Sequence, residues 1–304
     1  MPTPPVYILG GAQTDFAINY TKQGKGLVDL FRDSVTAAMQ SAQIDPKEID
    51  VAHVGNFVGE LMCYQGHLGA FFLEVDPAFA GLPTARHEAA CASGSIATLA
   101  AMAEIEAGRY DLACVLGVEM ERNVPSTEAA SHLGTAAWHA RECEGVKYPW
   151  PQLFSRLADE YDERFGIKRV HLEHLSRMAI ENGARNPNAQ TRVWNFTEES
   201  FLENDEANPV IEGRIRRQDC SQVTDGGACI FLASEPFANE YAKRRGIALD
   251  SIPRIKGWGH HTAFIAFDDK IAESKGQPYN CPHIRATAAD DFKRANMRDV
   301  EAGH

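Results

Sequence analysis

A single cysteine, Cys91, stands where a nucleophile would be placed, between a predicted strand and a predicted helix that begins in a run of small residues. Free backbone N–H groups and aligned peptide dipoles at a helix start favour an anion, so we expect the Cys91 thiol to have a lower pKa than a free cysteine. The same N–H groups could stabilise an oxyanion when the thiolate attacks a carbonyl group. The competing interpretation is a buried structural cysteine, because free cysteine is among the residue types most often buried.

Histidines offer weaker candidates. His87 lies four residues before Cys91, but an extended chain would place it about 13 Å away, so we interpret it as structural. His171 and His174 have the helical spacing of a ligand pair. With no third ligand at a recognisable spacing, a solvated helix face is the better interpretation, and we expect no metal site.

The elements that must position Cys91 alternate between strand and helix. Strands are predicted at 6–9, 51–58, up to residue 90 and at 112–116, with helices at 27–42, 67–74 and 96–105. This alternation predicts an α/β fold with a largely parallel sheet covered by helices. The helix of residues 96–105 is apolar on nearly every side, and we expect it to be buried. Gly10-Gly11-Ala12 lacks the further residues of a phosphate loop and is interpreted as a turn.

The pattern changes between about residues 121 and 217, where glycines, prolines and aromatic residues are scattered and helices are predicted at 153–165 and 170–185. This stretch resembles an insertion. The sheet pattern returns at 228–233, followed by a helix near 236–246 and a strand at 252–255. A final helix is predicted from Asp290 onward.

Composition excludes several classes of protein. The chain has 304 residues, a formal net charge of −12 and seven cysteines. The cysteines include no C-x-x-C pair, so a disulfide framework and structural zinc are not expected. The acidity and the absence of a basic cluster argue against a nucleic-acid partner. No run of eighteen apolar residues and no signal peptide are recognisable, so we expect a cytoplasmic protein without membrane insertion.

Four segments together resemble the thiolase family, and more closely its sterol-carrier-protein type. The segment around Cys91 is similar to the family's nucleophile motif, and the second resembles the strand end that leads into its CoA-binding loop domain. The third is similar to the return from that domain, and the fourth to the first strand of the C-terminal domain. In order, the segments are His87–Gly94, Gly117–Glu121, Asp219–Ala228 and Gly257–His261.

The resemblance implies a thiolase-like layered α-β-α-β-α fold. The N-terminal sheet domain would comprise residues 1–120 and 218–250, with a CoA-binding loop domain inserted at 121–217. Residues 251–304 would begin an incomplete C-terminal domain. Family members associate, so the resemblance also implies a homodimer or tetramer.

By the same resemblance, the chain would be an acyl-CoA C-acyltransferase of lipid metabolism, either an acetyl-CoA acetyltransferase or a 3-ketoacyl-CoA thiolase. Cys91 would carry the acyl group as a thioester, and its backbone N–H would form part of the oxyanion hole. Ser221 would contact the pantetheine arm. Coenzyme A thioesters would be the substrates, with no bound cofactor.

The family's activating histidine, a second histidine motif and a C-x-G cysteine lie in its C-terminal domain, and the sequence reaches none of them. Cys143-Glu144-Gly145 has the C-x-G letters but falls in the insertion, and we interpret it as coincidence. We therefore expect little turnover by this chain alone, or a second polypeptide that supplies the missing part. The alternatives are a condensing enzyme that works in the synthetic direction and a non-catalytic thiolase-like subunit that binds CoA or a partner.

Overall fold

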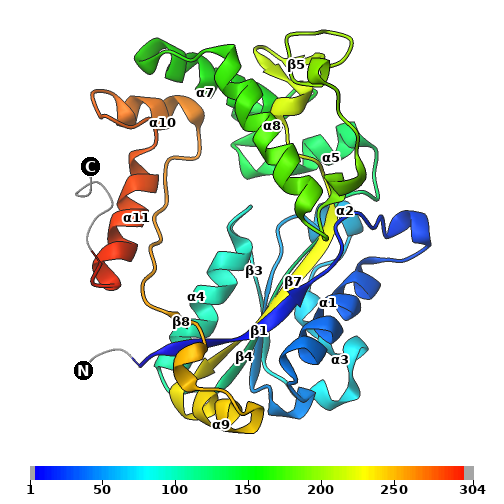
Figure 1. The fold of residues 1–304 in the computed structure, drawn as a ribbon, viewed down its shortest axis with the longest axis vertical. Helices are drawn as coiled ribbons and strands as arrows, with labels where there is room; N and C mark the ends of the chain where they lie inside the picture. Colours follow the sequence, from blue (N-terminus) through cyan, green and yellow to red (C-terminus); the bar gives the residue numbers. More distant parts are fainter. Residues whose placement is uncertain (1–3, 298–304) are drawn as a thin grey trace.

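The computed structural model describes residues 4–297, and its centre is a six-stranded mixed sheet (Figure 1). The strand order is β3-β2-β4-β7-β1-β8. β2 is parallel to β3 and β4, whereas β4–β7, β7–β1 and β1–β8 are antiparallel. The strands are β1 (Val6–Gln13), β2 (Val51–Gly55), β3 (Thr84–His87), β4 (Leu112–Met120), β7 (Asp225–Ser234) and β8 (Arg254–Ile255).

The prediction of a largely parallel sheet is therefore wrong, because three of its five strand pairs are antiparallel. β7 returns to β4 after the long excursion of residues 121–224 instead of through one crossover helix, so parallel pairing is not imposed on it.

The predicted turn at 10–12 is also wrong, because these residues continue β1. There the register shifts between Ile8 and Gly10, and Gly10 has a φ of 128°, which favours glycine.

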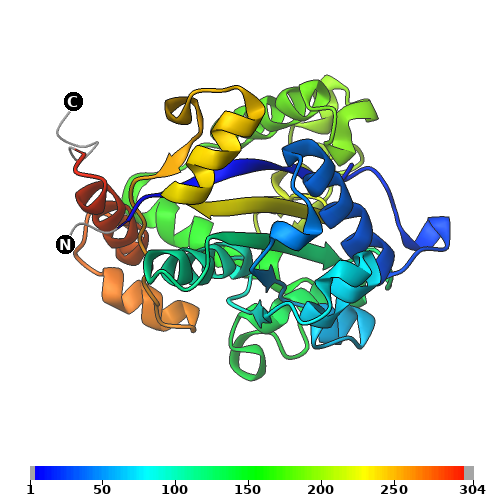
Figure 2. The same cartoon turned by 90° about the horizontal axis from the view of Figure 1, so that it is seen from below.

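One face of the sheet is covered by α1 (Leu27–Ala42), α3 (Phe72–Val75) and α9 (Glu235–Arg245) (Figures 1 and 2). The predicted helix 27–42 is confirmed. Its buried stripe includes Leu30, Phe31 and Val35, and the Phe31 ring meets Phe72 edge-on, with 5.0 Å between centroids. These aromatic and aliphatic contacts form the larger hydrophobic core.

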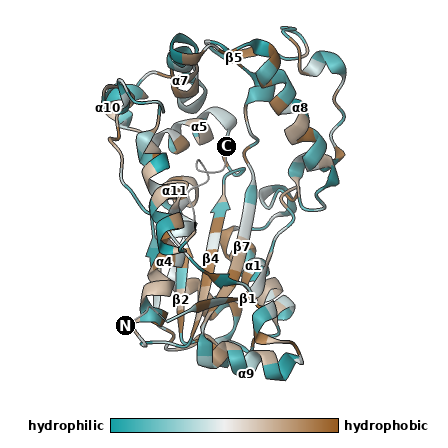
Figure 3. Cartoon of the chain, turned by 60° about the vertical axis from the view of Figure 1, so that its left-hand side comes forward, coloured by the Kyte–Doolittle hydropathy of each residue, from teal (hydrophilic) through white to brown (hydrophobic). Residues whose placement is uncertain are grey.

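The opposite face of the sheet is covered by α4 (Ser93–Glu106). Ala97, Ala101, Met102 and Ile105 pack on it, and Figure 3 shows how hydrophobic residues concentrate along the strands. The expectation that this helix is buried on all sides is only half right. Away from this cluster several apolar residues are half-buried or exposed, namely Ile96, Ala100 and Ala103.

Residues 121–224 form a separate group beyond the ends of β4 and β7 (Figure 1). The predicted helices at 153–165 and 170–185 are confirmed as the longer α7 and α8. The group contains α5 (Ser126–Leu133), α6 (His139–Glu142), α7 (Pro149–Phe165), α8 (Arg169–Arg185) and the hairpin strands β5 (Val210–Glu212) and β6 (Ile215–Arg216).

After β8 the chain runs without strand pairing to α10 (Phe267–Ser274) and α11 (Pro282–Arg294). Gly257 and Gly259 allow it to approach the backbone of α11 so closely that a Cβ at either position would overlap a carbonyl oxygen. The last helix was predicted to begin at Asp290, but α11 begins earlier, at Pro282. The part of that prediction that covers residues 298–304 lies outside the described residues. Between residues 4 and 297 no helix is both long and apolar enough to cross a membrane.

Candidate active site

Cys91 lies in a tight turn between β3 and α4, and its side chain is exposed. The preceding Ala90 adopts the left-handed conformation with a φ of 49°, which an L-residue rarely takes without support from its surroundings. Ser93 provides that support, because its hydroxyl donates to the Ala90 carbonyl at 2.6 Å and accepts from the Ala89 amide at 2.9 Å. Ser93 is the first residue of α4, so the start of this helix fixes the turn that exposes the Cys91 thiol.

The start of α4 rests directly on the end of β2. A Cβ at Gly55 would lie 2.6 Å from the amide nitrogen of Gly94, so only glycine fits this contact. In the sheet, Gly55 is paired with His87 of β3 and Gly117 of β4. Cys91 thus lies at the carboxyl ends of three parallel strands, which is the edge where open α/β sheets bind their ligands.

The end of β4 turns carboxylates toward the side of the sheet that carries Cys91. Ala113 and Val115 belong to the core cluster under α4. Because side chains alternate along a strand, Gly117, Glu119 and the following Glu121 face the same side. Both carboxylates act on Cys91 electrostatically.

Glu119 fixes the turn that follows β2. Its carboxylate accepts hydrogen bonds from the Asn56 side chain at 3.0 Å and from the Val58 amide at 3.4 Å, and it also accepts from the Phe57 amide. Burial nevertheless raises the pKa of Glu119 to about 7, because the loss of hydration outweighs these amide donors. Through these hydrogen bonds Glu119 joins the end of β4 to the turn that follows β2.

Glu121 is held differently. No hydrogen bond or ion pair reaches its carboxylate from the residues between 4 and 297. Its pKa is raised to about 7 by burial first, and then by the charges of Glu119 and Asp225. Its backbone is fixed, since the Glu121 amide donates to the buried Asp225 carboxylate at 3.0 Å, as do the amides of Arg122 and Tyr20.

The pKa of the Cys91 thiol is raised, so the expectation of a lowered value is wrong. Partial loss of hydration is the main cause, followed by repulsion from Glu121, and a smaller contribution comes from Glu119. The dipole argument considered only the helix start, whereas Glu119 of β4 and Glu121 just after that strand lie more than twenty residues later in the chain.

His87 takes part in a polar chain beneath α4. Its Nε2 lies 2.8 Å from His53 Nδ1, and His53 Nε2 lies 3.1 Å from Glu104 of α4. Burial lowers the pKa of both histidines. These contacts agree with the structural interpretation of His87. Sequence reasoning missed His53 and Glu104, because only the folded register brings them together.

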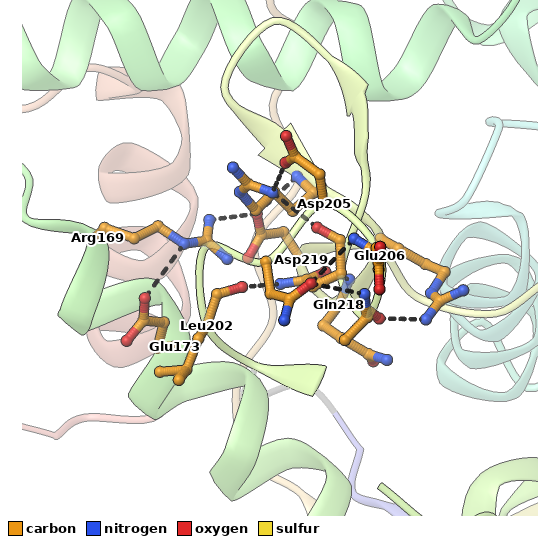
Figure 4. Close-up of polar contacts among 12 residues, drawn as sticks. Arg169, Glu173, Leu202, Asp205, Glu206, Gln218 and Asp219 are labelled. Carbon is orange, nitrogen blue, oxygen red and sulfur yellow. Dashed lines mark hydrogen bonds and ion pairs between the residues drawn. The ribbon is translucent and has the colours of Figure 1, made fainter. Parts of the chain in front are cut away.

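Ser221 is exposed on the segment that leads into β7, and its hydroxyl reaches only the neighbouring Gln222 carbonyl, at 3.4 Å. A polar network holds the chain just before it (Figure 4). Asp219 accepts from Arg169 at 2.6 Å and from the Arg216 amide at 2.8 Å. This anchoring leaves the Ser221 hydroxyl available, but none of the described contacts joins it to Cys91.

The remaining candidates from the sequence lie in other parts of the chain. His171 and His174 are exposed, as the solvated-face interpretation predicts. In the described part of the chain, no three His, Cys, Asp or Glu side chains are grouped to hold a metal ion. Cys143 is buried and contacts the Gly134 carbonyl at 3.6 Å, and His261 pairs with Asp290 at 3.1 Å.

Comparisons with known proteins agree with this architecture. The sequence model of the family described as "Thiolase, N-terminal domain" matches residues 6–200. An acetyl-CoA acetyltransferase of Methanocaldococcus jannaschii is 32% identical over 303 residues, which cover 97% of this chain and 70% of that protein. The acetyl-CoA acetyltransferase of Methanothermobacter thermautotrophicus is 28% identical over 258 residues, covering 83% of this chain and 63% of that protein.

Solved structures show the same fold. The human mitochondrial 3-ketoacyl-CoA thiolase in complex with CoA superposes with a TM-score of 0.66 at 16% identity, over 97% of this chain and 77% of that one. The chain thus spans about two thirds to three quarters of the relatives that it matches. On the family match, which covers more than half of its length, the chain belongs to the thiolase family.

Proposed function

We propose that this chain takes part in thiolase-type acyl transfer and carries the acyl group of an acyl-CoA as a thioester on Cys91. The observation that carries the proposal is the placement of Cys91, which is exposed in a turn fixed by Ser93 at the carboxyl ends of parallel strands. A structural cysteine would instead be expected to lie buried, as Cys114 and Cys229 do in the core. Acetyl-CoA acetyltransferases among its relatives support the same reaction class.

The transfer proceeds in two halves. The Cys91 sulfur attacks the thioester carbonyl, the bond to the CoA sulfur breaks, and the acyl group remains on the enzyme while CoA leaves as the thiol. In the second half the acyl group passes from Cys91 to CoA or to a second acyl-CoA. The Cys91 backbone N–H, next to the start of α4, is a donor for the oxyanion formed at each attack.

The exposed Ser221 hydroxyl is the second element of the proposal, as a contact for the pantetheine arm. The network around Asp219 fixes the backbone immediately before it, so the hydroxyl is presented without being consumed by other side chains. Ser221→Ala should weaken acyl-CoA binding and leave the acylation rate at saturating acyl-CoA nearly unchanged. A changed saturating rate with unchanged binding would contradict this role.

Intact-mass analysis tests the nucleophile. Wild-type chain is incubated with acetyl-CoA and is expected to gain one acetyl group, whereas Cys91→Ala gains none. Cys220→Ala is the matched control, because Cys220 is also a partly accessible free cysteine. An adduct that survives in Cys91→Ala would overturn the assignment. A folded wild type without adduct would favour the non-catalytic, CoA- or partner-binding alternative.

A further inference from the structure

A chain of polar side chains crosses the otherwise apolar contact between α4 and the sheet. His53 of β2 is only 3% exposed, and its two ring nitrogens contact His87 of β3 at 2.8 Å and Glu104 of α4 at 3.1 Å. The surrounding contact is formed by apolar residues such as Ala101. Burying a histidine costs hydration, and the transfer of an acyl group to Cys91 gives this one no task, so the polar chain needs a separate explanation.

The two outer members of this polar chain lie on either side of Cys91 in the sequence. His87 ends β3, four residues before the thiol, and Glu104 belongs to α4, thirteen residues after it. His53 contacts both, so the strand that enters the Cys91 turn and the helix that leaves it are tied to one residue of β2. A satisfied polar network inside an apolar contact rigidifies it and specifies one arrangement.

We infer that His53 is a positioning residue for Cys91, which holds the two ends of the Cys91 turn together and releases them when both histidines are protonated. The consequence for acyl transfer rests on the proposed function, whereas the position of the turn does not depend on it. Gly55 shows how short the connection is. It pairs with His87 in the sheet and lies against the Gly94 backbone at the start of α4.

The hydrogen bonds define which protons the polar chain holds. The Glu104 carboxylate is an acceptor, so Nε2 of His53 carries a proton, and Nδ1 of the same neutral ring is an acceptor. That acceptor takes the Nε2 proton of His87, which leaves Nδ1 of His87 without one. A first added proton therefore binds there with both hydrogen bonds retained. A second would have to bind Nδ1 of His53, where two N–H groups would face each other across 2.8 Å.

The charges around the two rings favour this opening at low pH. Burial lowers the pKa of both histidines below the ordinary value of 6.5, and the charge of His53 lowers that of His87 further. Glu104 acts in the opposite direction on both, but one carboxylate does not balance two positive rings. The residues of β4 in register with this part of β2 are uncharged, and the charged neighbours of His87 in the sequence have partners of their own. They are Val115 and Gly117, and Arg86 and Glu88, respectively.

Two substitutions of His53 separate hydrogen bonding from titration. His53→Gln keeps a donor for Glu104 and an acceptor for His87 but takes up no proton, whereas His53→Phe keeps a ring and removes both hydrogen bonds. The exposed His174→Gln is the matched control. Hydrogen–deuterium exchange of the peptide that contains Cys91 is measured without acyl-CoA between about pH 5 and pH 8, with correction for the intrinsic exchange rate.

At pH 7.5 the Cys91 peptide should exchange at the wild-type rate in His53→Gln and about tenfold faster or more in His53→Phe. Between about pH 6.5 and pH 5 its exchange should rise at least about threefold in wild type and in His174→Gln, but not in His53→Gln. The inference would be overturned by equal exchange in wild type and His53→Phe, by a His53→Gln as fast as His53→Phe at pH 7.5, or by the same rise at low pH in wild type and His53→Gln.

The wild-type protein provides a test that needs no variant. Imidazole ¹⁵N chemical shifts report which ring nitrogens carry protons. At pH 7.5 His53 should be protonated at Nε2 alone, and the first proton taken up on acidification should appear on His87. A His53 protonated at Nδ1 at pH 7.5 would contradict the proton arrangement and overturn the inference.

Acylation by acetyl-CoA, measured on the same proteins, distinguishes this inference from the proposed function. The acylation rate of His53→Gln relative to wild type should be near one at pH 7.5 and about threefold or more at pH 5, because only the wild-type turn opens. The expected exchange results without acylation of any variant would contradict only the nucleophile assignment. Acylation of wild type at Cys91 together with unchanged exchange in His53→Phe would contradict only the role of His53.

Discussion

The raised pKa of Glu121 makes the stability of the fold depend on pH in a defined direction. The folded state holds the Glu121 proton up to about pH 7, whereas an ordinary glutamate releases it near 4.5. Below 4.5 the group is protonated in both states, and its stabilising contribution is complete. That contribution is lost as the pH rises toward 7, because the unfolded chain then ionises more easily than the folded one.

The size of the effect follows from the shift. Each pKa unit corresponds to about 1.4 kcal/mol, so the full shift of Glu121 gives about 3 kcal/mol. Because the charge of Glu119 helps to raise the pKa of Glu121, part of this depends on Glu119, and we expect about 2 kcal/mol for Glu121 alone. Glu121→Gln keeps the shape of the side chain and removes the titration.

Urea unfolding at a series of pH values measures this directly. The free energy of unfolding of wild type should fall relative to Glu121→Gln by about 2 kcal/mol between pH 5 and pH 8. The histidine pair His53 and His87 contributes equally to both proteins, so it cancels in the difference. The urea m-values must agree, which shows that the same surface unfolds. Parallel stability curves for the two proteins would refute the reasoning.

Substitutions at three further positions test the positioning of the site by urea unfolding. Gly55→Ala should lose at least about 2 kcal/mol and slow Cys91 acylation, because the Gly94 backbone cannot yield; unchanged acylation would contradict the proposed contact. Asp225→Ala should lose at least about 2 kcal/mol, since three amides lose their acceptor. For Ala90, replacement by glycine should change stability by less than about 1 kcal/mol and replacement by valine should cost clearly more. A valine variant as stable as wild type would exclude the left-handed turn.

Local signals in the sequence were sufficient for several elements. The apolar stripe of residues 27–42 predicts α1 with its bounds, and the small residues after Cys91 predict the start of α4 within a few positions. Strand pairing was not predictable in the same way. The antiparallel return of β7 and the continuation of β1 through Gly10 depend on partners more than a hundred residues away.

The same division applies to the site. Cys91 could be predicted because its chemistry, its helix start and its family motif occupy one short segment. The raised pKa of its thiol could not, because it depends on Glu119 and Glu121, which strand alternation brings to the same side of the sheet. Alternation along residues 113–121 was a usable signal, since it places both glutamates on the face shared with Ala113 and Val115.

Peptide mapping of the acylated protein is the most direct test of the central claim. The wild-type chain is treated briefly with acetyl-CoA, quenched in acid, digested and analysed by tandem mass spectrometry. The account predicts an acetyl group on the sulfur of Cys91, which disappears when CoA is added before the quench. An acetyl group found only on other side chains, or one on Cys91 that CoA does not remove, would contradict it.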